Sequence, residues 1–253
     1  MMRVKNKNIF LIAIIALLFL AACGPSLAER KRMADANYKL GLKYYSEGNI
    51  QLAYVEFQKA IETYSEDRDS YYMLGIVNNN MGKLDEAVKM YKKALSIDPN
   101  FSDARTNLGV VYSSQKKWDE AIEEFKKAIS NPKYQYPQSA HYNLGLVYIN
   151  KNDLQKALKE FETAIRVQPN FEPAYFQMGQ VYDRMGKRRE AIINYLEAIR
   201  INPGLIDAHY YLGLAYYKEG SKKLAVEEFK KVIEAAPESE FAASSKRYLN
   251  ILK

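Results

Sequence analysis

The stretch that decides the fold is residues 144–161, LGLVYINKNDLQKALKEF. A Leu-Gly pair opens it, an Ala follows twelve residues after the Gly, and an aromatic residue follows four residues after the Ala. Residues 108–125, LGVVYSSQKKWDEAIEEF, carry the same pattern 36 residues earlier. Two copies of one pattern indicate an internal repeat, and further copies extend along most of the chain.

The repeat has six copies, spaced by 34 residues except for one step of 36. When the Gly of the Leu-Gly pair is numbered position 8, position 20 is always Ala and position 24 is always Phe or Tyr. Position 27 is Ala in every copy except the last, which has Val232, and position 32 is Pro in four copies. Small residues at 8, 20 and 27 let two helices approach closely, and Pro ends the second helix. We expect the aromatic residue at position 24 to fill the space between neighbouring helix pairs.

This pattern resembles the tetratricopeptide repeat (TPR), whose period and order of Leu-Gly, Tyr, Ala, Phe, Ala and Pro it matches. The resemblance implies an all-α fold, a right-handed TPR superhelix of six helix-turn-helix repeats over residues 34–239, with a C-terminal capping helix at 240–253. The predicted repeats are 34–67, 68–101, 102–137, 138–171, 172–205 and 206–239.

The single step of 36 residues places a two-residue insertion in Ser130–Ser139, between the third and fourth repeats. We expect a longer loop there. Two interpretations stay open: a harmless variation in loop length, or an accessory contact made through Tyr134 and Tyr136.

The N-terminus has the composition of an export signal. Arg3, Lys5 and Lys7 precede an apolar run that begins at Ile9 and ends at Leu20. With Ala21 and Ala22 the run has 14 residues, fewer than the roughly 20 that a membrane-spanning helix needs. Residues 1–22 are therefore predicted to be a lipoprotein signal peptide, with an uncleaved membrane anchor as the alternative.

The end of this segment, Leu20-Ala21-Ala22-Cys23, resembles the lipobox of bacterial lipoproteins, and Cys23 is the only cysteine. The resemblance implies that lipid is attached to Cys23, and that residues 23–33 are the lipidated Cys and a tether. Because Gly24 stands where an Asp would retain the protein at the inner membrane, it also implies an outer-membrane lipoprotein whose body faces the periplasm.

Composition excludes several kinds of site. One Cys and two His exclude a disulfide framework and most thiolate or multi-histidine metal sites. His141 and His209 both stand at position 4 of their repeats, and we expect structural roles for them, without a catalytic partner. No catalytic, metal or cofactor site is predicted besides the lipid on Cys23, and the chain is not expected to be an enzyme. Without residues 1–22 the chain has 34 basic and 30 acidic residues, and this small excess of positive charge does not favour nucleic acid as a partner. No small-molecule substrate is expected.

The family resemblance implies that the first helix of each repeat exposes positions 2, 5, 9, 12 and 13 in a concave groove. Here these positions are mostly aromatic and aliphatic, which favours an apolar segment of a protein partner. Tyr38 and Leu42 replace the Lys and Asn with which some TPR modules clamp a terminal carboxylate. The alternative is that these side chains pack on one another. The predicted groove residues are Tyr38, Leu42, Tyr45, Tyr72, Ile76, Asn79, Thr106, Val110, Tyr142, Leu146, Ile149, Phe176, Tyr210 and Tyr217.

Signal, lipobox, six repeats and a terminal helix together resemble the type IV pilus pilotin family, the pilus biogenesis/stability lipoproteins. That resemblance implies a scaffold that binds a secretin subunit, or another component of an envelope complex, and helps the secretin to localise and assemble. Two alternatives stay open: an adaptor that docks peptidoglycan hydrolases, and a subunit of an outer-membrane protein assembly machine.

Overall fold

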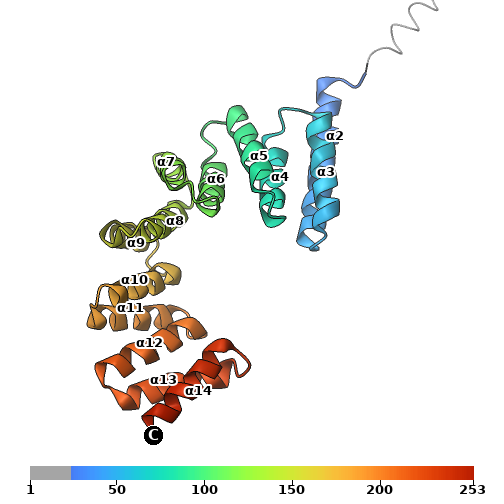
Figure 1. Cartoon of the computed structure of the whole chain (residues 1–253). Helices are drawn as coiled ribbons and strands as arrows, with labels where there is room; N and C mark the ends of the chain where they lie inside the picture. Colours follow the sequence, from blue (N-terminus) through green and yellow to red (C-terminus); the bar gives the residue numbers. More distant parts are fainter. Residues whose placement is uncertain (1–23) are drawn as a thin grey trace, which may run out of the picture. The chain divides into compact units, whose positions relative to one another are not determined.

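The computed structural model describes residues 24–253. The predicted signal peptide and the lipid attachment at Cys23 lie outside these residues. The described part contains thirteen α-helices and no strand (Figure 1). It divides into two compact units, one ending at Pro99 and the other beginning at Asn100. The all-α prediction is therefore confirmed.

The helices follow one another as pairs separated by short turns. In the first unit they are α2 (Leu27–Ser46), α3 (Ile50–Thr63), α4 (Arg68–Asn80) and α5 (Leu84–Ile97). In the second unit they are α6 (Ser102–Ser114), α7 (Trp118–Ile129), α8 (Pro137–Asn150), α9 (Leu154–Val167), α10 (Glu172–Arg184), α11 (Arg188–Ile201), α12 (Ile206–Glu219), α13 (Lys222–Ala235) and α14 (Glu240–Leu252). We call the first helix of a pair helix A and the second helix B.

Each pair is held together by one contact that recurs six times. The ring at position 24 of helix B lies directly against the Gly at position 8 of helix A. A Cβ atom added to Gly145 would lie 2.5 Å from the Phe161 ring, and the other five glycines give 2.4–2.8 Å. Only a residue without a side chain fits there, which explains the Gly in every repeat.

The aromatic residue at position 24 thus fills the space inside its own helix pair. Our expectation that it would fill space between neighbouring pairs is also confirmed, because Phe57 shares a core cluster with Leu74 of the next repeat, and Tyr195 shares one with Leu212. The alanines at positions 20 and 27, with Val232 in the last repeat, are completely buried, as the small-residue pattern predicts. Close helix packing of this kind is a general consequence of small interface residues.

Local sequence sets the helix ends. Helices α5, α9, α11 and α13 each end two residues before the Pro at position 32, which cannot continue a helix. The turn between helices A and B needs a positive φ at position 15 in every repeat. Four repeats have Gly there, whereas Lys116 and Asn152 adopt φ values of 59° and 58°. Side chains rarely adopt this conformation, so Lys116 sits in a strained turn.

The first helix begins earlier than the repeat pattern suggests. Ser26 caps α2 by accepting a hydrogen bond from the Glu29 backbone, while the Glu29 carboxylate accepts one from the Ser26 backbone. Residues 27–33, which we expected to belong to a tether, are therefore the first two turns of α2. Only Gly24, Pro25 and Ser26 precede the helix within the described residues.

In the second unit the A helices form a continuous layer. Helix α6 contacts α8, α8 contacts α10, and α10 contacts α12, besides the contacts of each helix with the next one in the chain. Helix α14 contacts both α13 and α12, so it takes the place that another helix A would occupy. No helix within residues 24–253 combines the length and the apolar character that crossing a bilayer requires.

Candidate partner-binding surface

All fourteen predicted groove residues lie on A helices. Thirteen of them are at least partly exposed, and one, Thr106, is buried. In the second unit, the contacts between consecutive A helices bring their residues together in one layer. In the first unit, Tyr38, Tyr45, Tyr72 and Ile76 all pack against the core formed around Phe57 and Leu74.

The aromatic residue at position 5 packs on the ring at position 24 of its own repeat. Five repeats share this arrangement, with ring centroids 5.8–6.2 Å apart and planes inclined by 48–55°. Such tilted pairs add to the energy of burial. The five pairs are Tyr38 with Phe57, Tyr72 with Tyr91, Tyr142 with Phe161, Phe176 with Tyr195, and Tyr210 with Phe229.

These rings therefore have two faces with different roles. One face packs on the helix pair, and the remainder stays partly exposed. Partial burial raises the pKa of the Tyr142 hydroxyl, and burial together with Asp69 and Asp67 raises the pKa of Tyr38. Both hydroxyls are thus neutral hydrogen-bonding groups at physiological pH. This packing differs from the alternative that the groove side chains pack on one another, because the partner of each ring is the position-24 ring of helix B.

The third repeat breaks the pattern. Position 5 is Thr106, and its hydroxyl lies 2.9 Å from the hydroxyl of Tyr134, which comes from the predicted insertion. Asn131 holds the same loop by donating to the Asn100 carbonyl at 2.9 Å and to the Ser102 hydroxyl at 2.9 Å. The insertion thus supplies an aromatic ring where helix A lacks one. Thr106 itself is covered and does not belong to an open surface.

Other aromatic rings cover part of the predicted groove. Tyr210 lies 4.9 Å from Phe241 of α14, and Tyr217 lies 5.2 Å from Tyr248 of the same helix. Tyr142 packs edge-on against Phe171 at 5.5 Å. Nothing in the repeat pattern pointed to these contacts.

The edge of the A-helix layer is polar. Position 12 of one repeat contacts position 13 of the next: Asn80 donates to the Tyr45 hydroxyl at 3.0 Å, and Lys218 lies 2.7 Å from Asp183. These contacts connect neighbouring repeats.

Leu42 is the most exposed apolar member of the predicted groove, at 36%. Asn79 and the other aliphatic members of the predicted groove are partly exposed. These aliphatic members are Ile76, Val110, Leu146 and Ile149.

The two histidines have carboxylate partners that the sequence did not reveal. The Nδ1 atom of His141 lies 2.7 Å from Glu160, and that of His209 lies 2.5 Å from Glu228. Our expectation that they lack a positioned partner is wrong. In the third repeat the same two positions hold Arg105 and Glu124, 2.9 Å apart. Because an Arg can replace the His, the pair is a structural link between helices A and B.

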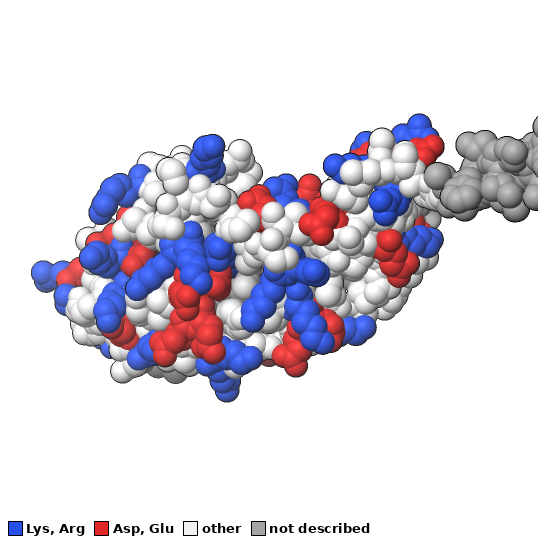
Figure 2. All heavy atoms as spheres, turned by 90° about the horizontal axis from the view of Figure 1, so that it is seen from above, with Lys and Arg blue, Asp and Glu red and all other residues white. Residues whose placement is uncertain are grey.

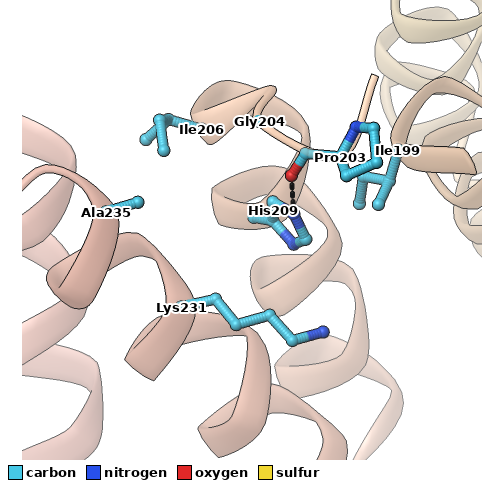
Figure 3. A pocket seen from close by; sticks show the side chains of 7 residues that line it. All are labelled: Ile199, Pro203, Gly204, Ile206, His209, Lys231 and Ala235. Carbon is cyan, nitrogen blue, oxygen red and sulfur yellow. Dashed lines mark hydrogen bonds between the residues drawn. The ribbon is translucent and has the colours of Figure 1, made fainter. Parts of the chain in front are cut away.

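His209 also contacts a second acceptor, the Pro203 carbonyl, 3.0 Å from its Nε2 atom (Figure 3). The hydrogen bond with Glu228 raises the pKa of His209, burial opposes this, and the Pro203 carbonyl reinforces it. The protonated ring donates from both nitrogens. His209 lies beside a cavity of about 350 Å³. Figure 3 shows Ile199, Ile206 and Lys231, which also line it.

On the face that Figure 2 shows, charged side chains do not form a large area of one sign. Lys and Arg alternate there in small groups with Asp and Glu. Within residues 24–253, no group of three or more His, Cys, Asp or Glu side chains is placed to hold a metal ion. The surface is therefore suited to contacts between proteins more than to a strongly charged polymer.

Family patterns match the chain at five places. The TPR repeat pattern matches residues 79–116 and 184–220, and the tetratricopeptide repeat pattern matches 102–132, 139–171 and 206–239. The chain belongs to the tetratricopeptide repeat proteins. Arrays of this family are scaffolds that bind other proteins along the surface made by their stacked repeats. No match is found among curated proteins.

Solved structures resemble this TPR protein over most of its length. PilW, a widely conserved type IV pilus biogenesis factor, has 18% sequence identity and a TM-score of 0.77, covering 83% of this chain and 97% of PilW. The pilF protein of Pseudomonas aeruginosa has 21% identity and a TM-score of 0.75, covering 87% of this chain and 99% of pilF. MamA has 34% identity and a TM-score of 0.57, covering 64% of this chain and 94% of MamA.

Proposed function

We propose that this TPR protein is an outer-membrane lipoprotein that binds a secretin subunit of the type IV pilus and assists its assembly. The observation that carries the proposal is the match to PilW and pilF, which this chain covers over 97% and 99% of their length. The lipobox that ends at Cys23 supports it independently. A lipid anchor and a protein-binding array together would raise the concentration of the partner at the membrane.

We further propose the division of the chain stated above. Residues 1–22 are removed as a signal peptide, Cys23 is lipidated, and residues 34–239 form the binding array, with the body facing the periplasm. Binding needs neither a cofactor nor catalysis. Cys23→Ser should abolish the incorporation of labelled palmitate, and continued labelling of that variant would contradict the anchor.

The A helices of each unit supply binding surface in this proposal. Their rings are held in fixed orientations by the position-24 rings, so a partner meets a surface that is already ordered. Leu42, Ile76, Val110, Leu146 and Ile149 add aliphatic area beside the ring edges. A surface of this kind fits an apolar helix or an extended segment of the secretin subunit.

A deletion strain tests the role. Secretin monomers should still be made, but heat-resistant secretin multimers should be scarce in outer-membrane fractions, and surface pili should be lost. A gel of those fractions beside a monomer blot of whole cells measures both. Normal multimers and normal piliation would reject the pilotin function and favour the adaptor for peptidoglycan hydrolases.

A matched pair of variants tests the surface. Leu42 on α2 is 36% exposed and Val55 on α3 is 41% exposed, so a charge at either site costs little stability. Leu42→Glu should weaken binding of the purified secretin subunit about tenfold or more, as expected for an interface contact. Val55→Glu, on the other helix of the same repeat, should leave affinity unchanged. Equal affinities of the two variants would place the binding surface elsewhere.

A further inference from the structure

The cations of α2 fall into two groups with different surroundings. Lys39, in the middle of the helix, lies 2.7 Å from Asp35, and Lys43 lies 3.9 Å from Glu47. In the first two turns, Arg30 and Arg32 form no ion pair with any residue in the described part of the chain.

The third cation of the first turns has acidic residues nearby but forms no ion pair among the described residues. Lys31 lies over the Tyr64 ring, 5.2 Å from its centre, and lines a pocket together with Asp35, Asp67 and Asp69. The one carboxylate in these turns, Glu29, is engaged by the Ser26 backbone at 2.7 Å. The start of α2 therefore presents three consecutive cations, all exposed.

Exposed apolar side chains flank these cations. Leu27 is 53% exposed and Met33 is 50% exposed. Exposed cations beside exposed aliphatic side chains are the composition that binds the headgroup region of a membrane: the cations meet phosphate, and the apolar chains enter the boundary of the acyl layer.

Chain length places this cluster beside the lipid anchor of the proposed function. Cys23 precedes Leu27 by four residues, which span at most about 14 Å when extended. Each helical residue after Leu27 adds only about 1.5 Å along the axis, so Arg32 lies no more than about 8 Å further. The first turns of α2 cannot leave the neighbourhood of the membrane that holds Cys23.

We propose that the first two turns of α2, from Leu27 to Met33, dock on anionic phospholipid headgroups through Arg30, Lys31 and Arg32. The proposal rests on the lipid anchor for its location, but the contact is a property of these side chains themselves. Docking would hold the start of α2 against the membrane. Lys39 and Lys43, farther along the helix, are already engaged by carboxylates and would contribute less to this contact.

The test uses the unlipidated body, residues 24–253, which contains every helix that the structure describes. Flotation with phosphatidylcholine vesicles should show no binding, whereas vesicles that also contain phosphatidylglycerol should bind the protein, less strongly as salt is added. The triple variant Arg30→Gln, Lys31→Gln, Arg32→Gln should bind these vesicles about a hundredfold more weakly, because each cation near an anionic surface contributes roughly fivefold in affinity.

A matched variant on α13 is the control. Lys222, Lys223 and Lys230 are also exposed, and changing all three to Gln should leave vesicle binding unchanged. An equal loss in this control, full binding by the α2 variant, or no binding of the unchanged body to the anionic vesicles would overturn the proposal. The mass of the chain extracted from cells reports lipidation separately, so failure of the anchor is distinguishable from failure of the α2 contact.

Discussion

The first and the last repeat of this protein differ in what covers them. In the last repeat, α14 packs on the helix pair: Tyr248 stacks on Phe229 at 5.2 Å, and Phe241 lies 4.9 Å from Tyr210. In the first repeat no helix of the described residues covers the equivalent side of α2. Leu40 at position 7 is 37% exposed, while Leu74, at the same position one repeat later, is 1% exposed.

This difference shows that burial in a repeat array depends on neighbours more than on the repeat itself. Identical residues at identical positions are core in one copy and surface in another, because Leu74 is covered by Phe57 of the preceding repeat and Leu40 has no preceding repeat among the described residues. The C-terminal end is closed by the chain's own helix. Within residues 24–253 no helix covers the N-terminal end, and this is the end that the proposed lipid anchor holds at the membrane.

The largest expected effect comes from truncating position 7 at each end. Leu212 is completely buried in the last repeat. Leu212→Ala should lower the free energy of unfolding of the protein by about 2–5 kcal/mol, because the substitution leaves a cavity. Leu40→Ala should cost less than about 1 kcal/mol, because its side chain is partly in water. Urea unfolding followed by circular dichroism measures both. Equal losses would mean that the N-terminal end is covered in solution.

The aromatic contacts of α14 should have the next largest effect. Phe241→Ala combined with Tyr248→Ala should cost about 2–3 kcal/mol, because two partly buried ring contacts are lost. Hydrogen exchange should accelerate in α12 and α13. Ile251→Ala on the same helix is the control, since Ile251 is 64% exposed and should matter little. Unchanged exchange in the double variant would show that α14 does not close the last repeat.

Protonation of His209 should make the C-terminal end sensitive to pH. Its folded pKa is raised, first by the hydrogen bond with Glu228. The stabilisation is therefore complete below the unfolded pKa of about 6.5 and is lost as pH rises through the folded pKa. Between about pH 6 and pH 9 the loss should be on the order of 1 kcal/mol, the usual net contribution of one intramolecular hydrogen bond.

Two substitutions separate this effect from other titrations. The first repeat has Asn37 at the equivalent position, so no such link titrates there. His209→Gln should flatten the dependence of unfolding free energy on pH, and His141→Gln should preserve the part that His209 contributes. A steep dependence that persists in His209→Gln would assign it to other groups.

The smallest expected effect lies away from both ends. Lys116 occupies the positive-φ position of the third repeat, where four other repeats have Gly. Lys116→Gly should stabilise the protein by about 0.5–1 kcal/mol, because the strain of a side chain in this conformation is relieved. Gly220→Ala, at φ 90° in the last repeat, should destabilise it. Thermal unfolding of both variants checks the sign, and destabilisation by Lys116→Gly would refute the argument from turn strain.

Sequence reasoning identified the repeats because each repeat is held by short-range contacts. Gly145 and Phe161 are 16 residues apart and face each other in one helix pair, and the same spacing recurs in every copy. The Pro at position 32 acts within the chain's own backbone, so it also could be interpreted without a structure. Periodicity also placed the insertion at Ser130–Ser139, but it did not show what the insertion does.

What only the tertiary structure decided depends on contacts that have no period. Tyr134 forms a hydrogen bond with Thr106, and His209 forms hydrogen bonds with Glu228 and with the Pro203 carbonyl. Phe241 packs on the Tyr210 ring. These contacts join residues by packing between elements, so spacing alone could not predict them. The same is true of the groove: the pattern showed which residues lie on helix A. Whether a ring at position 5 is surface or core depends on the second helix and on the neighbouring repeat, because both determine how much water reaches it.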